Sequence, residues 1–291
     1  MDIILVHLGG KYPAYMQSCI KQIRKYTKDR IIVVVDSDQI VHFGSGEDIV
    51  VVQKNTLPAN EEWVRFKKTN HFDQFCDSFW RYACERFYAI EAAMEMFFID
   101  KALHLENDNL IYGTIDKQFF DNYCGKSVGI TQITSTLSSA GVMYVGSFDS
   151  MRMFNKKMND VMAMSRNDKF EKYGKEMQNE MRLMCIVEKE NPGLITCLPI
   201  EPCFDSKYVY DCASWGQYVG GTSHKPGESY KTDAHIIGKK LIDGQYDISW
   251  LDGANETIPS VVSTKGDRDG IVKYTPIFNL HIHSKELERW M

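Results

Sequence analysis

The stretch LHLENDNLIY at residues 103–112 places two carboxylates, Glu106 and Asp108, between two short apolar runs. Side chains at positions i and i+2 of an extended segment point to the same side, so the two carboxylates can converge on one cation. Mg²⁺ and Mn²⁺ prefer oxygen ligands, and an ion held there could in turn hold a diphosphate. The same spacing also occurs in ordinary solvated loops, so the flanking sequence is needed to separate the two interpretations.

Strand and helix patterns alternate through the first half of the chain. Residues 3–8 and 31–35 are short apolar runs typical of buried strands in a parallel sheet. Residues 13–27 lie between them and carry apolar side chains at helical spacing, with Pro13 suited to the first turn. This pattern predicts a strand–helix–strand unit, and residues 49–53 predict a third strand.

The alternation continues beyond this unit. Residues 72–99 form the longest helical pattern, and a strand predicted at 102–106 delivers the two carboxylates. The elements predicted next are two strands and then two helices, at 127–133, 140–146, 149–163 and 168–189. Residues 201–270 are rich in Gly, Asp, Ser and Tyr, and predict loops with short strands and a helix or two.

Alternating strands and helices predict a three-layer α/β fold. In sheets of this kind, ligands bind beyond the carboxyl ends of the strands. The loops that follow the predicted strands at 3–8 and 102–106 both fall on that edge. The acidic pair is therefore expected on the ligand-binding edge of the sheet.

Composition and charge exclude several classes of protein. The chain has 291 residues, is 44% hydrophobic and 25% charged, and carries a net charge of −5, so no bulk attraction to nucleic acid or acidic membranes is expected. No signal peptide and no apolar run of about 18 residues is visible, which favours a cytoplasmic protein without a transmembrane segment. The eight cysteines contain no Cys-x-x-Cys pair, so we expect reduced, mostly buried thiols rather than a structural zinc site.

Two histidines and a lysine near the end of the sequence offer partners for the acidic pair. His281 and His283 face the same side of an extended segment, and Mn²⁺ accepts mixed carboxylate and imidazole ligands. Lys285 could neutralise a phosphate as a point charge. The alternative is that one histidine lies on the surface and the other packs on the core.

Arg86 and the first loop are further candidates for ligand contacts. Arg86 lies in the predicted long helix, and its planar guanidinium suits bidentate contact with a sugar or phosphate, although a surface Glu–Arg pair would give the same pattern. The loop HLGGKYP at residues 7–13 precedes a helix, and its glycines allow close approach of a ligand. Tyr12 or His7 could stack on a base. The loop lacks the Gly-x-Gly-x-x-Gly pattern, and a plain turn is the alternative.

Three carboxylates in the second half are candidates for acid–base chemistry. Asp211 precedes aromatic residues and a Gly-Gly pair that would suit a sugar-binding loop, and Asp205 lies nearby in the sequence. Glu180 lies in the helix predicted at 168–189. Helix capping, turn formation and a solvated helix face are the structural alternatives for these residues.

Three segments together resemble the GT-A fold glycosyltransferases that use nucleotide sugars. FWRYACERFYAIEAAMEMFFIDKALHLENDNLIY at 79–112 resembles the Arg-bearing helix and acidic strand end of that family, where Asp-x-Asp binds Mn²⁺ or Mg²⁺. SSAGVMYVGS at 138–147 resembles the strand after the metal motif, whose Ala-Gly pair approaches the donor sugar. NLHIHSK at 279–285 resembles the segment that returns a histidine to the metal. The chain departs from the family pattern by Glu106 in place of the first aspartate.

The resemblance implies a GT-A-like three-layer α/β/α sandwich with a mixed, mainly parallel central sheet, in a single domain over residues 1–291. Residues 1–112 would form the nucleotide-binding half, and residues 113–291 the acceptor-binding half with a C-terminal metal-binding segment. The implied activity is metal-dependent transfer of a hexose or pentose from a nucleoside-diphosphate sugar, with UDP-sugar favoured, to a hydroxyl of a glycan or glycoconjugate.

The resemblance also implies roles for individual residues. Mn²⁺ or Mg²⁺ would be held by Asp108, with Glu106, His281 and His283 as further ligands. The implied donor contacts are His7, Leu8, Gly9, Tyr12, Arg86, Glu106, Asn107 and Lys285. An inverting enzyme needs a carboxylate base near the acceptor hydroxyl, and a retaining enzyme needs a carboxylate or amide near the anomeric centre. The candidates, in order of preference, are Asp211, Asp205 and Glu180.

Two other functions fit the same pattern. A sugar-nucleotide nucleotidyltransferase shares much of this fold and metal chemistry, but the first loop lacks the Gly-rich, basic signature that cradles a triphosphate. A non-catalytic carbohydrate-binding protein on the same fold is the other alternative. The joint presence of Glu106, Asp108, His281, His283 and Arg86 argues against it.

Overall fold

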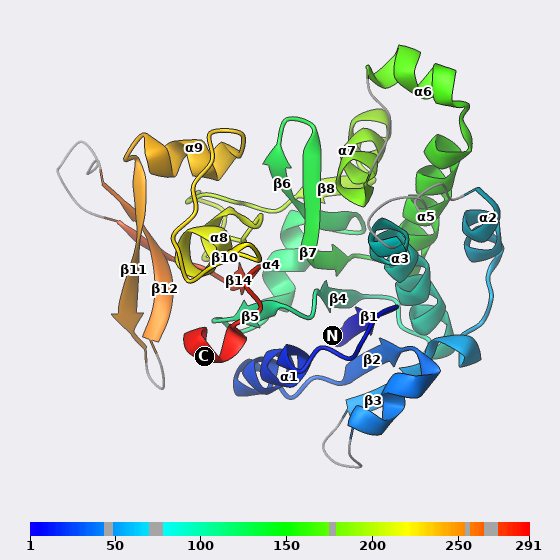
Figure 1. Ribbon diagram of the computed structural model, residues 1–291, viewed down its shortest axis with the longest axis horizontal. Helices are drawn as coiled ribbons and strands as arrows, with labels where there is room; N and C mark the ends of the chain where they lie inside the picture. The colour runs from blue at the N-terminus through cyan, green and yellow to red at the C-terminus, as the bar shows by residue number, and fades with distance from the viewer. Residues whose placement is uncertain (44–48, 70–77, 175–178, 254–256, 265–272) are drawn as a thin grey trace.

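The computed structural model describes residues 1–43, 49–69, 78–174, 179–253, 257–264 and 273–291 (Figure 1). Its first elements are β1 (Asp2–His7), α1 (Tyr15–Tyr26), β2 (Ile31–Val35) and β3 (Ile49–Gln53). The three strands pair in parallel. The predicted strand–helix–strand unit and the third strand are confirmed, although α1 begins at Tyr15 rather than at Pro13.

The central sheet has seven strands in the order β3-β2-β1-β4-β7-β6-β8. Its remaining strands are β4 (Ala102–Leu105), β6 (Val128–Thr134), β7 (Leu137–Val145) and β8 (Ile195–Cys197). β1 pairs with β4 in parallel and β6 pairs with β8 in parallel, whereas β7 runs antiparallel to both β4 and β6. The sheet is therefore mixed and mainly parallel, as predicted.

Both faces of this sheet are covered. In β1, Ile4 and Val6 join the core on one face, while Ile3 and Leu5 join the core on the other, which explains why the strand is continuously apolar. The helices that close the first core are α2 (Glu61–Thr69), α3 (Phe79–Met96), α5 (Phe148–Ala163) and α7 (Glu180–Glu190). The second core is closed by α1, by α4 (Lys117–Tyr123) and by segments of the second half. This is the predicted three-layer arrangement, with α1 and α3 on opposite sides of the sheet in Figure 1.

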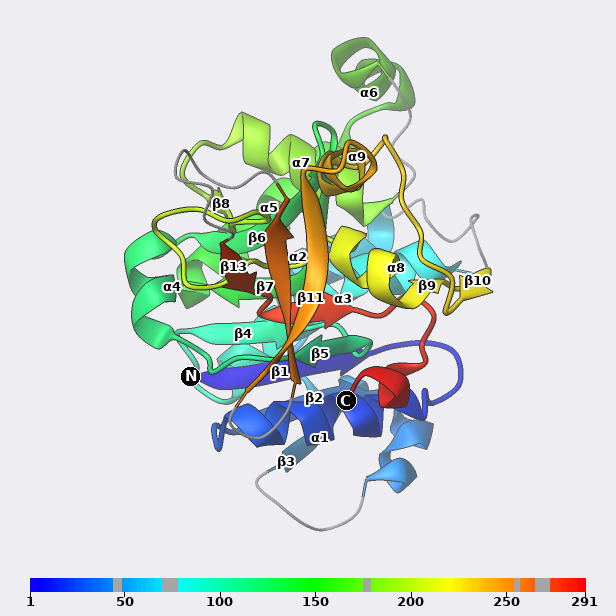
Figure 2. The same ribbon diagram turned by 90° about the vertical axis from the view of Figure 1, so that its left-hand side faces the viewer.

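Beyond residue 200 the chain adds smaller elements. They are α8 (Ser214–Gly220), β9 (Gly221–Thr222), β10 (Lys225–Pro226), α9 (Ile236–Ile242), β11 (Tyr246–Asp252), β12 (Thr257–Ser263) and β13 (Tyr274–Pro276). Of these, α8, α9, β11 and β12 contribute residues to the second core. The strands β11, β12 and β13 form an antiparallel sheet, and Figure 2 shows β11 and β12 in front of the central sheet. These elements agree with the short strands and one or two helices predicted for 201–270, of which 254–256 and 265–270 lie outside the described residues.

The single helix predicted at 168–189 is wrong, because the chain forms two helices there. α6 (Arg166–Tyr173) ends at Gly174, whose φ of +70° lies in the left-handed region that favours glycine. α7 begins after Asn179, whose side chain accepts a hydrogen bond from the first turn. Residues 175–178 lie outside the described part of the chain.

The long helix predicted at 72–99 is confirmed over the extent of α3, and residues 72–77 lie outside the described residues. Its apolar stripe is buried at Ala83, Ile90 and Met94, but Phe79 is 59% exposed. None of the described helices is long and apolar enough to cross a membrane. The described cysteines are free thiols and most of them are buried.

Candidate functional site

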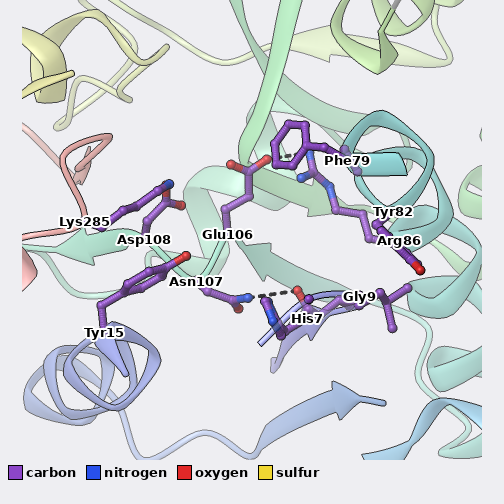
Figure 3. Close-up of a pocket in the computed structure, with 14 residues that line it drawn as sticks. His7, Gly9, Tyr15, Phe79, Tyr82, Arg86, Glu106, Asn107, Asp108 and Lys285 are labelled. Carbon is purple, nitrogen blue, oxygen red and sulfur yellow. Dashed lines mark hydrogen bonds and ion pairs between the residues drawn. The ribbon is translucent and has the colours of Figure 1, made fainter. Parts of the chain in front are cut away.

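A cavity of about 400 Å³ lies at the carboxyl edge of the central sheet (Figure 3). β1 and β4 run side by side in parallel there, so the loop after β1 meets the loop after β4. The acidic pair faces the cavity because β4 ends at Leu105, directly before Glu106. All the predicted donor contacts except Tyr12 line the cavity, namely His7, Leu8, Gly9, Arg86, Glu106, Asn107 and Lys285.

The C-terminal segment reaches the acidic pair through a short antiparallel ladder. β5 (Asn109–Ile111) follows Asp108 and pairs with β14 (Asn279–His281). The pairing places His281 opposite the first residue of β5. Beyond the ladder, the N–H of Ile282 donates to Asp108 O at 2.8 Å. The register of two short strands therefore sets the position of the imidazole beside the carboxylates.

Glu106, Asp108 and His281 form one cluster. His281 Nε2 lies 2.9 Å from Glu106 Oε2 and 3.1 Å from Asp108 Oδ1. Each of the three residues offers one ligand atom, and these atoms all lie within 4.8 Å of one another. Two carboxylates and an imidazole are a donor set that suits Mn²⁺ or Mg²⁺, so the residues fit the ion expected from the sequence.

His283 lies beside this cluster rather than in it. Its ring centroid is 4.3 Å from that of His281, but the three-residue group does not include it. Burial, together with the neighbouring His281, lowers the pKa of His283 to about 3, so its ring is neutral. Its Nε2 is buried and has no hydrogen-bond partner among the described residues. His281 and His283 are equivalent candidates in the sequence, but in the structure only His281 lies within the cluster of possible ligand atoms.

Two further basic side chains neutralise the cluster. Arg86 Nη2 lies 2.5 Å from Glu106 Oε1, and Lys285 Nζ pairs with Asp108 Oδ2. Burial alone would raise the pKa of both carboxyls, but Arg86 and His281 hold the pKa of Glu106 well below its usual range, and His281 and Lys285 do the same for Asp108. Burial would lower the pKa of His281, but the two carboxylates outweigh it and raise that pKa to about 10.

The first loop is held close to the acidic loop. Asn107 Nδ2 donates to Val6 O at 3.1 Å, and the N–H of Gly9 donates to Asp36 Oδ2 at 2.6 Å. Gly9 has a φ of +71°, and a Cβ there would lie 2.3 Å from the Tyr82 ring. Only glycine fits at this position, so the close approach of Tyr82 accounts for one of the two glycines of the first loop.

Tyr12 lies apart from the cavity lining. Its ring stacks on His42 with centroids 4.2 Å apart, and its hydroxyl accepts a hydrogen bond from Gln17 Nε2 at 2.7 Å. Tyr12 therefore already has an aromatic partner, whereas His7 lines the cavity. The predicted stacking of Tyr12 on a base gains no support from this position.

None of the three candidate catalytic carboxylates lines the cavity, and two of them have other surroundings. Asp211 is fully buried and accepts hydrogen bonds of 2.8–2.9 Å from the backbone N–H groups of Trp215, Gly216 and His281. It thereby caps α8 and ties it to β14, while burial raises the pKa of Asp211 to about 6. Asp205 is exposed and lines a different cavity. Neither position supports the predicted catalytic role, and helix capping explains Asp211.

Glu180, the last of the three in the predicted order, adjoins the site through Arg86. Its Oε1 lies 3.8 Å from Arg86 Nη2, the nitrogen that also contacts Glu106. Glu180 is 5% exposed, and its Oε2 has no hydrogen-bond partner among the described residues. Burial raises the pKa of Glu180 to about 7 against the opposing charge of Arg86.

Arg86 and its neighbour Glu85 do not form a surface pair, so that alternative is wrong. Glu85 is fully buried, where it accepts from Trp63 Nε1 at 2.9 Å and pairs with Lys54 Nζ at 3.0 Å. Arg86 instead lies on the cavity side of α3 (Figure 3). The interpretation of Arg86 as a group that faces a ligand is the one its position supports.

Sequence reasoning missed three aromatic residues of the cavity, Tyr15, Phe79 and Tyr82. Tyr15 opens α1 directly after the first loop, and that place in the chain is a signal that could have identified it. Phe79 and Tyr82 lie in the first turn of α3, where helical spacing made them candidates for the core. Spacing carries no information on which of them reaches the cavity instead.

Comparison with known proteins bears on the fold. No known protein family matches the sequence, and no curated protein matches it. The structure is similar to the crystal structure of mouse xyloside xylosyltransferase 1 in its apo form, with a TM-score of 0.50 and 12% identity over 75% of this chain and 90% of that chain. This similarity establishes the GT-A fold of the chain.

Two further solved structures are similar at lower scores. One is galactosyltransferase LgtC in complex with donor and acceptor sugar analogues, with a TM-score of 0.47 and 16% identity over 81% of this chain and 86% of that chain. The other is the PaToxG glycosyltransferase, with a TM-score of 0.42 and 10% identity over 66% of this chain and 69% of that chain.

Proposed function

We propose that this GT-A protein is a metal-dependent glycosyltransferase, which moves a sugar from a nucleoside-diphosphate sugar, with UDP-sugar favoured, to a hydroxyl of a glycan or glycoconjugate. The observation that carries the proposal is the cluster of Glu106, Asp108 and His281 beside the cavity. Arg86 and Lys285 add permanent positive charge at the cavity wall. A cation-binding cluster and fixed basic groups in one cavity match the charge of a diphosphate.

Each residue of the site has a distinct task in this proposal. Glu106, Asp108 and His281 would hold Mn²⁺ or Mg²⁺, which when bound supplies Lewis-acid stabilisation of the departing diphosphate. Arg86 contacts Glu106 and lines the cavity, where its fixed positive charge can face a ligand. Lys285 reaches the cavity beside Asp108 and suits a phosphate oxygen as a point charge.

Glu180 takes the role of proton acceptor in this proposal. An acceptor hydroxyl loses a proton as it attacks the anomeric carbon, and a carboxylate with a pKa near neutrality can receive it. Burial raises the pKa of Glu180 to about 7, and its contact with Arg86 places it next to the cavity wall. Asp211 and Asp205 are left out because one is engaged by backbone donors and the other lines a different cavity.

Thermal unfolding in the presence of nucleoside diphosphates tests the proposal. UDP with Mn²⁺ should raise the melting temperature, and EDTA should abolish the rise, because a ligand that binds only the folded state stabilises it. Asp108→Ala should remove the response while the protein stays folded. Asp205→Ala removes a carboxylate from the separate cavity and should leave the response unchanged. No response to any nucleoside diphosphate, with or without Mn²⁺, would rule the proposal out.

Turnover separates the proposal from the two alternatives raised by the sequence. Release of UDP from a UDP-sugar, lost in Asp108→Ala, is the result expected for a glycosyltransferase. Release of pyrophosphate from a nucleoside triphosphate and a sugar phosphate would instead indicate a nucleotidyltransferase. Binding of a glycan without release of either product would indicate a non-catalytic protein.

A further inference from the structure

Every carboxylate oxygen of the acidic pair contacts a basic nitrogen. Glu106 Oε1 pairs with Arg86, and Asp108 Oδ2 pairs with Lys285. His281 Nε2 lies between the other two oxygens, 2.9 Å from Glu106 Oε2 and 3.1 Å from Asp108 Oδ1. A divalent ion bound by these carboxylates must therefore compete with basic side chains for the same oxygen atoms.

Lys285 is the basic group that can leave most easily. Its side chain is 43% exposed, whereas those of Arg86 and His281 are 12% and 7% exposed. The Lys285 ammonium lies 5.6 Å from the centre of the Tyr15 ring, and Figure 3 shows both side chains next to Asp108 in the cavity. A flexible four-carbon stem lets the ammonium move within the cavity while the backbone stays in place.

Charge balance gives this movement a direction. The carboxylates of Glu106 and Asp108 already face two permanent cations, Arg86 and Lys285, besides the His281 ring. A divalent ion on its own would leave the site with excess positive charge, and Lys285 would repel it at close range. A diphosphate beside the ion carries negative charge and offers Lys285 a new partner.

We propose that Lys285 competes with the divalent ion for Asp108 and moves to the diphosphate when both ligands are bound, so that it couples their binding. This inference rests on the proposed function, because it takes the ion and a nucleoside diphosphate as the ligands. Lys285 then disfavours the ion bound alone and favours the ion bound with the nucleotide. By linkage, the nucleotide strengthens binding of the ion by the same factor as the ion strengthens binding of the nucleotide.

Isothermal titration calorimetry tests the coupling on the full chain. Mn²⁺ alone, and UDP in saturating Mn²⁺, are titrated into the wild type and into Lys285→Met at one ionic strength, since salt screens such interactions. Loss of the ammonium should tighten the binding of Mn²⁺ alone on the order of tenfold and weaken the binding of UDP on the order of tenfold. The opposite signs identify competition, because a purely structural role for Lys285 would weaken both affinities.

Lys225→Met is the matched control. Lys225 lies in β10 with its side chain 67% exposed and outside the cavity lining, so the substitution removes the same charge away from the site and should change neither affinity. Suppose that the wild type binds UDP in the presence of Mn²⁺. If Lys285→Met then loses both affinities, or changes neither, the coupling is overturned and the proposed function is not. A wild type that binds no UDP with Mn²⁺ would overturn the proposed function and the coupling together.

Discussion

The imidazole of His281 lies 2.9 Å from the Glu106 carboxylate, Nε2 to Oε2, where β14 pairs with β5. The other ring nitrogen, Nδ1, is buried without a hydrogen-bond partner among the described residues. It faces Gly141 of β7, where a Cβ would lie 2.9 Å from Nδ1. The ring therefore fits between the acidic pair and the central sheet only because position 141 carries no side chain.

Gly141→Ala should weaken Mn²⁺ binding on the order of tenfold, because the added methyl group displaces the His281 ring from the acidic pair. Calorimetry or Mn²⁺ electron paramagnetic resonance measures this affinity directly. Gly129→Ala is the matched control, because Gly129 lies in β6 of the same sheet and an added Cβ there would lie 3.0 Å from Cys124 Sγ. This substitution should leave the Mn²⁺ affinity unchanged. Wild-type Mn²⁺ affinity in Gly141→Ala would argue against His281 as a ligand.

Asp211→Asn should lower stability far more than turnover. The Asp211 carboxylate accepts from three backbone N–H groups, and an amide offers one acceptor oxygen in place of two, so at least one donor loses its partner. We expect a decrease of about 1–3 kcal/mol in the free energy of unfolding, measured in urea. The reverse result, near-complete loss of turnover at wild-type stability, would restore the catalytic role first predicted for Asp211.

The central sheet and the acidic strand end could be predicted because both depend on residues that are neighbours in the sequence. β2 is apolar at every position because it is buried on both faces, and that pattern is local. Glu106 and Asp108 come just after the end of β4, so a correct prediction of this strand also places them on the ligand-binding edge of the sheet. The resemblance to GT-A enzymes added the order of the later elements.

The remaining features depend on contacts between distant parts of the chain. The choice between His281 and His283 is set by the register of β14 on β5, which no local pattern records. Asp211 was predicted as a base because its neighbours are aromatic residues and glycines, but its partners are backbone N–H groups of α8 and β14. For Glu180 the sequence pattern also fits a solvated helix face, and its burial beside Arg86 comes from packing.

Lys54→Met should destabilise the protein by about 3 kcal/mol, because it leaves the fully buried Glu85 carboxylate without its closest counter-charge. Trp63 Nε1 still donates to Glu85 at 2.9 Å, and Arg81 Nε lies farther away at 4.0 Å. The double variant Lys54→Met/Glu85→Gln should recover part of the loss, since no charge is then buried unpaired. Urea unfolding of the single and double variants checks both statements, and equal stabilities of all the variants would contradict them.

Glu180 should make stability depend on pH. Burial raises the pKa of Glu180 to about 7, above the ordinary glutamate value of about 4.3, so folding favours the protonated carboxyl. Its contribution to stability is fully present below pH of about 4 and is lost as the pH rises through about 7. Glu180→Gln is neutral at every pH, so the free energy of unfolding of the variant relative to wild type should rise between pH 5 and pH 8, by on the order of 1–3 kcal/mol.

Urea unfolding of both proteins at the two pH values measures this change, and Glu171→Gln, at an exposed position of α6, controls for the loss of one carboxyl. The same titration should appear in catalysis, because only the ionised Glu180 can accept a proton. We expect kcat of the wild type to fall as the pH drops below about 7, and Glu180→Gln to lose turnover while it retains UDP binding with Mn²⁺. If the stability difference between Glu180→Gln and wild type is the same at pH 5 and pH 8, the raised pKa of Glu180 is contradicted. Wild-type turnover in Glu180→Gln would contradict the role of Glu180 as the base.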